Sequence, residues 1–89
     1  MLRLNLKDHA QRFIKRLPPK HAGQVLRKIA ALQKDPLPPD SKQLGGAIYR
    51  RADVGEYRIV YRVADKVLYI PLIGKRNDDD VYRRLKRMG

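Results

Sequence analysis

The sequence predicts an α+β domain in which helices cover one side of an antiparallel sheet. Apolar residues recur at helical spacing between residues 10 and 32, and from Ala47 the spacing changes to alternation. Consecutive strands with short connections pair antiparallel, and helices segregated to one side of such a sheet define this class. We therefore expect residues 1–89 to form a single domain with the order β-α-α-β-β-β-α.

The N-terminal third is expected to contain a short strand and an α-hairpin. Residues 1–6 alternate between apolar and polar, which predicts a strand with Leu2, Leu4 and Leu6 on one face. The first helix has Asp8 at its N-cap and ends at Pro18-Pro19, because proline cannot donate the helical hydrogen bond. A second helix starts near Lys20. The two apolar stripes, which would cover the sheet, are Ala10, Phe13, Ile14 and Leu17, then Val25, Leu26, Ile29 and Leu32.

A three-stranded meander is expected to follow a proline-rich loop at residues 36–39 and a turn at Gly45-Gly46. Its second strand places aromatic and basic residues on opposite faces. One face carries Tyr57, Ile59, Tyr61 and Val63, and the other carries Arg58, Val60 and Arg62. After a tight connection at Ala64-Asp65, residues 67–73 are apolar on both faces, which predicts a central strand. Pro71 lacks the N–H that such a strand needs, so we expect a bulge or a strand end there.

The chain is predicted to end in a short basic helix. Asn77 is a favourable N-cap, and the aspartates at 78–80 would occupy the first turn, where the helix dipole favours anions. Val81, Leu85 and Met88 form its apolar stripe.

Charge sets the expected class of partner. The chain carries 21 Lys and Arg against 9 Asp and Glu, a formal charge of +12. Such an excess opposes folding by self-repulsion and attracts polyanions, of which nucleic acid is the usual one. An anionic membrane, an acidic protein or a charge kept only for solubility are the alternatives. No apolar run approaches the roughly 20 residues that span a bilayer. The N-terminus is also too short for a signal peptide, so we expect a cytoplasmic protein without a membrane partner.

Familiar catalytic sets are absent from the sequence. There are no cysteines, and neither His9 nor His21 lies near acidic residues at metal-ligand spacing. Ser41 is expected in a polar loop with no base nearby, and Gly74-Lys75 lacks the rest of a phosphate loop. We therefore expect no metal and no cofactor.

Basic residues and tyrosines instead interleave on the predicted strands. Arginines at 50, 58 and 62 sit among tyrosines at 49, 57 and 61, and Lys75, Arg76 and Tyr82 follow the last strand. If the helices cover the tyrosine face, Arg58 and Arg62 lie on an open, concave basic surface. Arginine forks bind phosphate oxygens, and an aromatic ring can stack on an unpaired base.

Three motifs in this region resemble those of the RelE/ParE toxin superfamily of type II toxin–antitoxin systems. Residues 57–61, Tyr-Arg-Ile-Val-Tyr, are similar to the superfamily's Y-R-[IVL]-[IVL]-Y strand. Gly74-Lys75-Arg76, followed by Val81-Tyr82, resembles the G-K-R…V-Y ending of the RelE branch, and residues 42–46 resemble its K-x-L-x-G turn. The expected order of elements also fits this family over nearly the whole chain.

The resemblance implies a toxin, and its RelE branch implies a messenger-RNA endonuclease that acts at the ribosome and inhibits translation. RelE-like members keep the last helix with its tyrosine, as this chain does. The implied chemistry is metal-independent attack by the RNA 2′-hydroxyl. Basic positions of the family match Arg50, Arg58 and Arg76, with Tyr82 at the C-terminal tyrosine. The lead-in from Arg50 to Glu56 differs in length from the best-known member, so the second basic strand position has no unambiguous match at Arg51 or Ala52.

We assign roles to these residues as hypotheses. Arg58 and Arg76 would hold the scissile phosphate, Lys75 would be an acid or a phosphate contact, and Tyr82 would stack on a base or act as general base. Further contacts to the RNA backbone are expected from Arg50, Arg51, Arg62 and Arg83.

The resemblance also implies binding partners, and it leaves other functions open. The partners would be a cognate antitoxin, forming a heterocomplex, and messenger RNA with the ribosome. The ParE branch offers a DNA gyrase inhibitor without nuclease activity. A non-enzymatic nucleic-acid-binding module, or an inactive toxin that still binds its antitoxin, would share the same basic surface.

Overall fold

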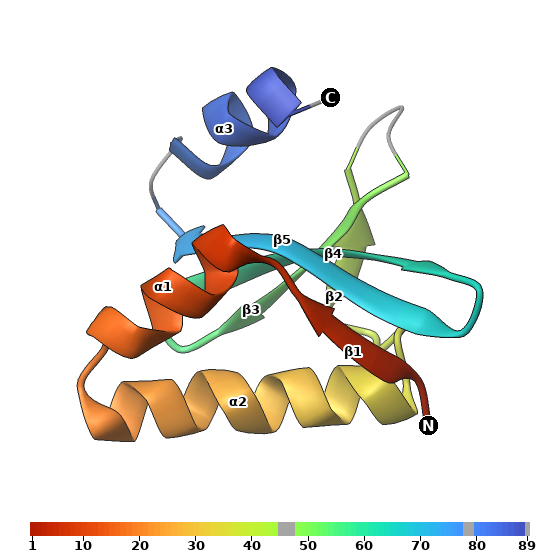
Figure 1. Ribbon diagram of the computed structural model, residues 1–89, viewed down its shortest axis with the longest axis horizontal. Coiled ribbons are helices and arrows are strands. Elements are labelled where there is room, and N and C mark those ends of the chain that lie inside the picture. The colour runs from red at the N-terminus through yellow and green to blue at the C-terminus, as the bar shows by residue number, and fades with distance from the viewer. Residues whose placement is uncertain (45–47, 78–79, 89) are drawn as a thin grey trace.

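The computed structural model describes residues 1–44, 48–77 and 80–88 and shows an α+β fold, as predicted (Figure 1). Its five-stranded sheet has the order β1-β5-β4-β3-β2. The described elements are β1 (Arg3–Leu6), α1 (Asp8–Arg16), α2 (Pro19–Lys34), β2 (Ser41–Gln43), β3 (Arg50–Val54), β4 (Tyr57–Ala64), β5 (Val67–Lys75) and α3 (Asp80–Met88). None of the described helices combines the length and apolar character needed to cross a membrane.

Two features of the sheet go beyond the predicted order. β1 pairs parallel with β5, from Arg3 opposite Val67 to Leu6 opposite Ile70, so the first strand closes one edge of the meander. β2 forms the other edge, where Ser41 pairs with Ala52. The expectation that Ser41 lies in a polar loop is wrong, because its side chain is buried and its hydroxyl donates to the Pro38 carbonyl at 2.8 Å. Three polar residues give β2 no alternation that would reveal it.

The helix starts also differ from the prediction. Lys7 is the N-cap of α1 and makes no side-chain cap bond, whereas Asp8 is the first helical residue, where its charge still meets the helix dipole. α1 ends at Arg16, and Pro19 occupies the first helical position of α2, where a missing N–H costs nothing. The structure describes α3 from Asp80 onward, so it does not test the predicted start just after Asn77. The predicted turn at Gly45-Gly46 and residues 78–79 lie outside the described residues.

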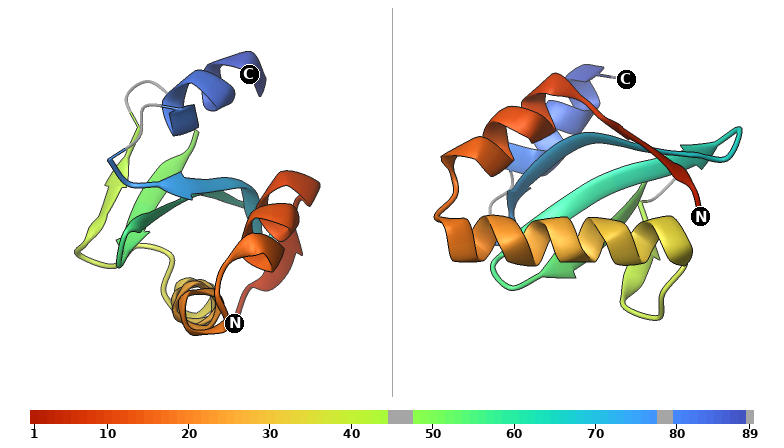
Figure 2. Two further views of the ribbon diagram at one scale, coloured as in Figure 1. Left: turned by 90° about the vertical axis from the view of Figure 1, so that its left-hand side faces the viewer. Right: turned by 60° about the horizontal axis from the view of Figure 1, so that its bottom comes forward.

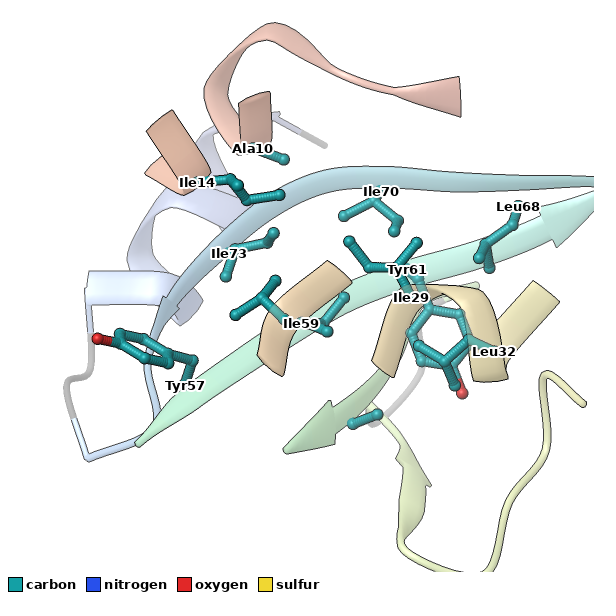
Figure 3. Packing of buried hydrophobic residues seen from close by; sticks show 12 residues of the cluster. Ala10, Ile14, Ile29, Leu32, Tyr57, Ile59, Tyr61, Leu68, Ile70 and Ile73 are labelled. Atoms are coloured by element: carbon teal, nitrogen blue, oxygen red, sulfur yellow. The ribbon is translucent and has the colours of Figure 1, made fainter. Parts of the chain in front are cut away.

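The main core lies between the sheet and the α1–α2 pair, as the two apolar stripes predict (Figure 3). Tyr57, Ile59 and Tyr61 face these helices and are 6%, 0% and 0% exposed. The buried Tyr61 hydroxyl donates to the Pro36 carbonyl at 2.6 Å, which ties the proline-rich loop to the middle of β4. Helix coverage of the tyrosine face is therefore confirmed.

Pro71 coincides with an irregularity of the β4–β5 ladder, as expected. Val60 is opposite Leu72 and Arg62 is opposite Tyr69, so three residues of β4 face four of β5. The extra residue is the bulge that lets a proline occupy a central strand. As a consequence, Tyr69 and Leu72 both point to the face that lies away from α1 and α2.

That second face is partly covered by α3, which Figure 2 shows across the sheet from α2. Val60, Leu72 and Val81 are buried there, and Leu44, Tyr49 and Leu85 pack around them. The expected open arginine surface is therefore divided: this small core lies between Arg58 near the start of β4 and Arg62 near its end. α3 can lie so close because residue 74 is glycine. An added Cβ at Gly74 would be 2.2 Å from Val81 Cγ2.

Candidate active site

Three arginines converge on the carboxylate of Asp53. Arg58 donates from Nε to Oδ1 at 2.8 Å and from Nη2 to Oδ2 at 3.2 Å. Arg51 Nη1 lies 3.3 Å and Arg76 Nε lies 3.7 Å from Oδ2 of the same carboxylate. Together with Tyr82, these four residues form what we call the arginine cluster: Arg51, Asp53, Arg58, Arg76 and Tyr82.

The β3–β4 hairpin explains why the first three residues meet. Asp53 is the cross-strand partner of Arg58, and Arg51 lies two residues before Asp53 on the same face of β3. This register is set by a two-residue turn, Gly55-Glu56, in which Gly55 has a φ of +56°. Gly55 takes this left-handed conformation without steric cost.

Arg76 joins the cluster from the end of β5, through the same turn. Its backbone N–H donates to the Glu56 carbonyl at 2.9 Å, and its Nη1 approaches the Gly55 carbonyl at 3.4 Å. The side chain of Arg76 is 57% exposed, against 13% for Arg58. Arg58 is therefore fixed within the cluster, while Arg76 is the member most open to a ligand.

Tyr82 is placed over Arg58 by α3. Arg58 Nη1 donates a hydrogen bond to the Tyr82 hydroxyl, and the guanidinium carbon lies 5.6 Å from the ring centroid. The preceding residue, Val81, is buried against Gly74 and anchors this turn of α3 to the sheet. Because the hydroxyl oxygen accepts from Arg58, its own proton remains available to another acceptor.

The cluster keeps a net positive charge. The hydrogen bond from Arg58, with the charges of Arg58, Arg51 and Arg76, holds the pKa of Asp53 below its usual value. The same hydrogen bond raises the pKa of Arg58. One carboxylate thus faces three guanidinium groups, and two positive charges remain for an anionic ligand. Of the five N–H donors of Arg58, two on its Nη atoms bind neither Asp53 nor Tyr82, and within the described part of the chain they have no other hydrogen-bond partner that would compete with such a ligand.

The sequence-predicted residues divide into two groups. Arg51, Arg58, Arg76 and Tyr82 lie together in the cluster. Arg50 does not join them, because it is the partner of Tyr61 on the face that α1 and α2 cover. Its Nη2 donates to Ser41 Oγ at 2.9 Å instead. The structure therefore does not bring Arg50, which was expected to contact nearby RNA backbone, to Arg58 and Arg76; alternation along β3 puts Arg51 there instead.

The other predicted residues are not among these four. Lys75 is opposite Tyr57 in the ladder, so its side chain leaves the strand on the face away from Arg58, although it lines a pocket with Arg76 beside the Gly55-Glu56 turn. Arg62 lies near the far end of β4 and stacks on Tyr69, with 4.5 Å between guanidinium carbon and ring centroid. Arg83 is exposed on α3.

Asp53 is the member of the cluster to which neither the motifs nor the resemblance points. A signal was present: a two-residue turn at Gly55-Glu56 makes Asp53 the direct neighbour of Arg58. Among the residues that the structure describes, His, Cys, Asp and Glu side chains form no group of three suited to a metal ion.

Comparisons with known proteins agree with this fold. The family model for the ParE toxin of the type II toxin–antitoxin system parDE matches residues 4–80. A comparison with curated proteins finds no match. Solved structures do match, and the Escherichia coli RelE toxin, in a doubly substituted form in the free state, is 22% identical with a TM-score of 0.81, covering 99% of this chain and 98% of that one.

Two toxin–antitoxin complexes are also similar. The archaeal RelE–RelB complex from Pyrococcus horikoshii contains a chain that is 27% identical, with a TM-score of 0.76 and coverage of 85% of this chain and 96% of that one. The RelBE-type complex from Mycobacterium tuberculosis gives 25% identity, a TM-score of 0.71 and coverage of 84% and 98%. Since the family model spans most of the sequence and the fold agrees throughout, the chain belongs to the RelE/ParE toxin superfamily of type II toxin–antitoxin systems.

Proposed function

We propose that this toxin is a metal-independent endoribonuclease that cleaves messenger RNA at the ribosome and so inhibits translation. The observation that carries the proposal is the convergence of Arg51, Arg58 and Arg76 with the Tyr82 hydroxyl on one patch of the sheet. A patch with two uncompensated positive charges and fixed donors suits a transferring phosphate.

The reaction uses a nucleophile that the substrate brings. The 2′-hydroxyl of the RNA attacks the adjacent phosphorus, the 2′-O–P bond forms, and the bond to the 5′-oxygen of the next nucleotide breaks. The proton leaves the 2′-oxygen and one is supplied to the 5′-oxygen, which yields a cyclic 2′,3′-phosphate and a free 5′-hydroxyl. The protein has to align these atoms and stabilise the charge of the phosphorane.

The cluster divides this work among its members. Arg58, held by Asp53 and Tyr82, offers its two remaining N–H donors in a fixed direction. Arg76, the most exposed member, closes on the phosphate from the turn side. Asp53 keeps three like charges together, and so reduces the reorganisation required when the phosphate arrives. Tyr82 stacks on a base or exchanges a proton with the reacting oxygens.

Alanine substitution tests the assignment. Arg58→Ala and Arg76→Ala should each lower RNA cleavage by roughly 100-fold or more, the range for removal of one donor to a developing charge. Arg27→Ala is the matched control, because Arg27 is an exposed arginine of α2, across the sheet from α3. Circular dichroism checks folding, and Arg76 is the safer position because its side chain is mostly exposed. Cleavage and growth arrest as in the wild type for both variants would refute the proposal.

The tyrosine has its own test. Tyr82→Phe keeps a ring for stacking but loses the hydroxyl, so retained cleavage indicates stacking and lost cleavage indicates proton transfer. A substrate with a 2′-deoxynucleotide at the cleaved position should remain intact, and cleavage should persist in EDTA.

A second candidate function is inhibition of DNA gyrase without nuclease activity. The family model that matches describes a ParE toxin, and its match ends at residue 80, before Tyr82. Supercoiling by purified gyrase and cleavage of RNA during cell-free translation distinguish the two functions. A module that only binds nucleic acid would affect neither reaction.

The proposal includes an antitoxin partner. The Pyrococcus and Mycobacterium structures are complexes of a toxin with its antitoxin. A chain with a formal charge of +12 is complementary to an acidic segment that folds when it binds. Co-expression with the neighbouring open reading frame should yield a heterocomplex on size exclusion, whereas abundant free and harmless protein would count against it.

A further inference from the structure

A second basic and aromatic site lies on the same face of the sheet as the arginine cluster. It is a pocket of about 680 Å³ where β1 runs into α1, and its lining includes Asn5, Lys7, Tyr49, Arg62 and Tyr69. This volume falls within the usual range of small-molecule sites, roughly 300–1,000 Å³. None of the reaction steps above uses these residues.

Tyr69 is flanked by two cations. The Arg62 guanidinium carbon lies 4.5 Å and Lys7 Nζ lies 5.5 Å from the centroid of its ring. Tyr69 lies on β5, and the strands on either side of β5 are β4 and β1. Arg62 belongs to β4 and Lys7 directly follows β1, so the two charges approach the ring from both sides. Asp8 also lines the pocket, but one carboxylate does not balance two cations.

The pocket offers the features that recognise a nucleotide. A guanidinium that stacks on a tyrosine keeps its edge donors free for phosphate oxygens, and Lys7 adds a second donor to the same anion. Tyr49 and Tyr69 supply ring surface for the sugar and base, and Asn5 supplies amide groups. An anion with an attached flat ring therefore fits the lining.

Position on the sheet favours RNA over an acidic peptide. Arg58 and Arg62 point to the same face of β4, and four residues of strand separate them by about 13 Å. Between them lies the small core that α3 closes, and α3 exposes further cations at Arg83, Lys86 and Arg87. The arginine cluster and the pocket therefore lie on the same face of the sheet, on either side of this small core.

We propose that this pocket binds a nucleotide of the single-stranded RNA that flanks the cleaved linkage. Binding of this nucleotide would position the RNA so that a particular linkage lies at the arginine cluster during cleavage. The proposal rests on the proposed function, to which it adds a subsite for the same RNA.

Binding of a non-cleavable RNA tests this directly. The probe is a fluorescein-labelled single-stranded oligoribonucleotide with a 2′-deoxynucleotide at the cleavage position, followed by fluorescence anisotropy over a series of salt concentrations. Lys7→Ala/Arg62→Ala should weaken binding by roughly tenfold, and should reduce the slope of log K against log salt by about 0.7, because both cations contact the same phosphate. Tyr69→Leu should also weaken binding by roughly tenfold, whereas Tyr69→Phe should retain it.

Arg12→Ala/Arg27→Ala is the matched control, since it removes the same amount of charge from exposed positions on the helices. RNA affinity unchanged in the pocket variants, or lowered equally in the control, would overturn the proposal. The proposal would also be overturned if the pocket variants lost binding to an acidic peptide while their affinity for RNA stayed unchanged. Wild-type protein that binds RNA through the pocket but cleaves nothing would refute only the proposed nuclease. Cleaving protein that is indifferent to the pocket variants would refute only the subsite.

Discussion

Replacing Gly74 by alanine tests how α3 is held on the sheet. The new Cβ would lie 2.2 Å from Val81 Cγ2, well inside van der Waals contact, and Val81 is only 2% exposed. Either Val81 moves and its buried surface is exposed, or the turn that carries Tyr82 lifts away from Arg58. Both responses weaken the contact between α3 and β5.

The expected magnitude follows from two opposing effects. Overpacking of this kind costs about 1–3 kcal/mol. Alanine in a strand recovers about 0.5–1 kcal/mol relative to glycine, because the unfolded chain loses freedom. With the middle of each range, the net loss in free energy of unfolding is about 1 kcal/mol. Each 1 kcal/mol lowers Tm by about 4–8 °C in a domain of this size.

Gly23→Ala provides the matched control within the same chain. It lies in α2, and its added Cβ would meet only the flexible end of Arg27, at 3.3 Å. The same chemical change should therefore raise the free energy of unfolding there, by about 0.8–1 kcal/mol from helix propensity.

Urea unfolding followed by circular dichroism measures both effects, and a double variant identifies the cause. In Gly74→Ala/Val81→Ala the clash is absent, so the combined loss should be smaller than the sum of the two single losses. Cleavage should fall in Gly74→Ala, since Tyr82 is displaced. A Gly74→Ala protein as stable as the wild type, or losses that simply add, would refute the reasoning.

Three further predictions concern stability. Tyr61→Phe should lower the free energy of unfolding by about 1–2 kcal/mol, because the partly buried Pro36 carbonyl loses its 2.6 Å donor; an unchanged denaturation midpoint would contradict this. Asp53 should stabilise the protein above its unfolded pKa of about 3.9, and this contribution should disappear as pH falls through the lower folded pKa. The gap in stability between wild type and Asp53→Asn should therefore be widest near neutrality and close in acid, and a gap independent of pH would exclude this linkage. Asp40→Asn should lower the free energy of unfolding by less than about 1 kcal/mol despite the 2.6 Å contact with Lys28, because the Asp40 side chain is largely exposed and solvent screens the pair. A larger loss, measured from the shift in Tm, would contradict this.

Periodicity in the sequence determined the class of fold and most of its elements. The helical stripes identified the faces of α1 and α2 that are buried, and alternation in β4 identified which face its tyrosines share. Pro71 predicted the bulge because the missing N–H is a local property of the chain. Motif resemblance pointed to Arg58, Arg76 and Tyr82, which the structure brings together.

Tertiary structure decided what depends on pairing between distant segments. The parallel partnership of β1 with β5 and the short edge strand β2 have no strong local pattern, since their hydrogen bonds are made to residues far along the chain. Strand register, not composition, placed Arg51 in the cluster and Arg50 on the opposite face. The role of Asp53 arises in the same way, because only folding brings three guanidinium groups around its carboxylate.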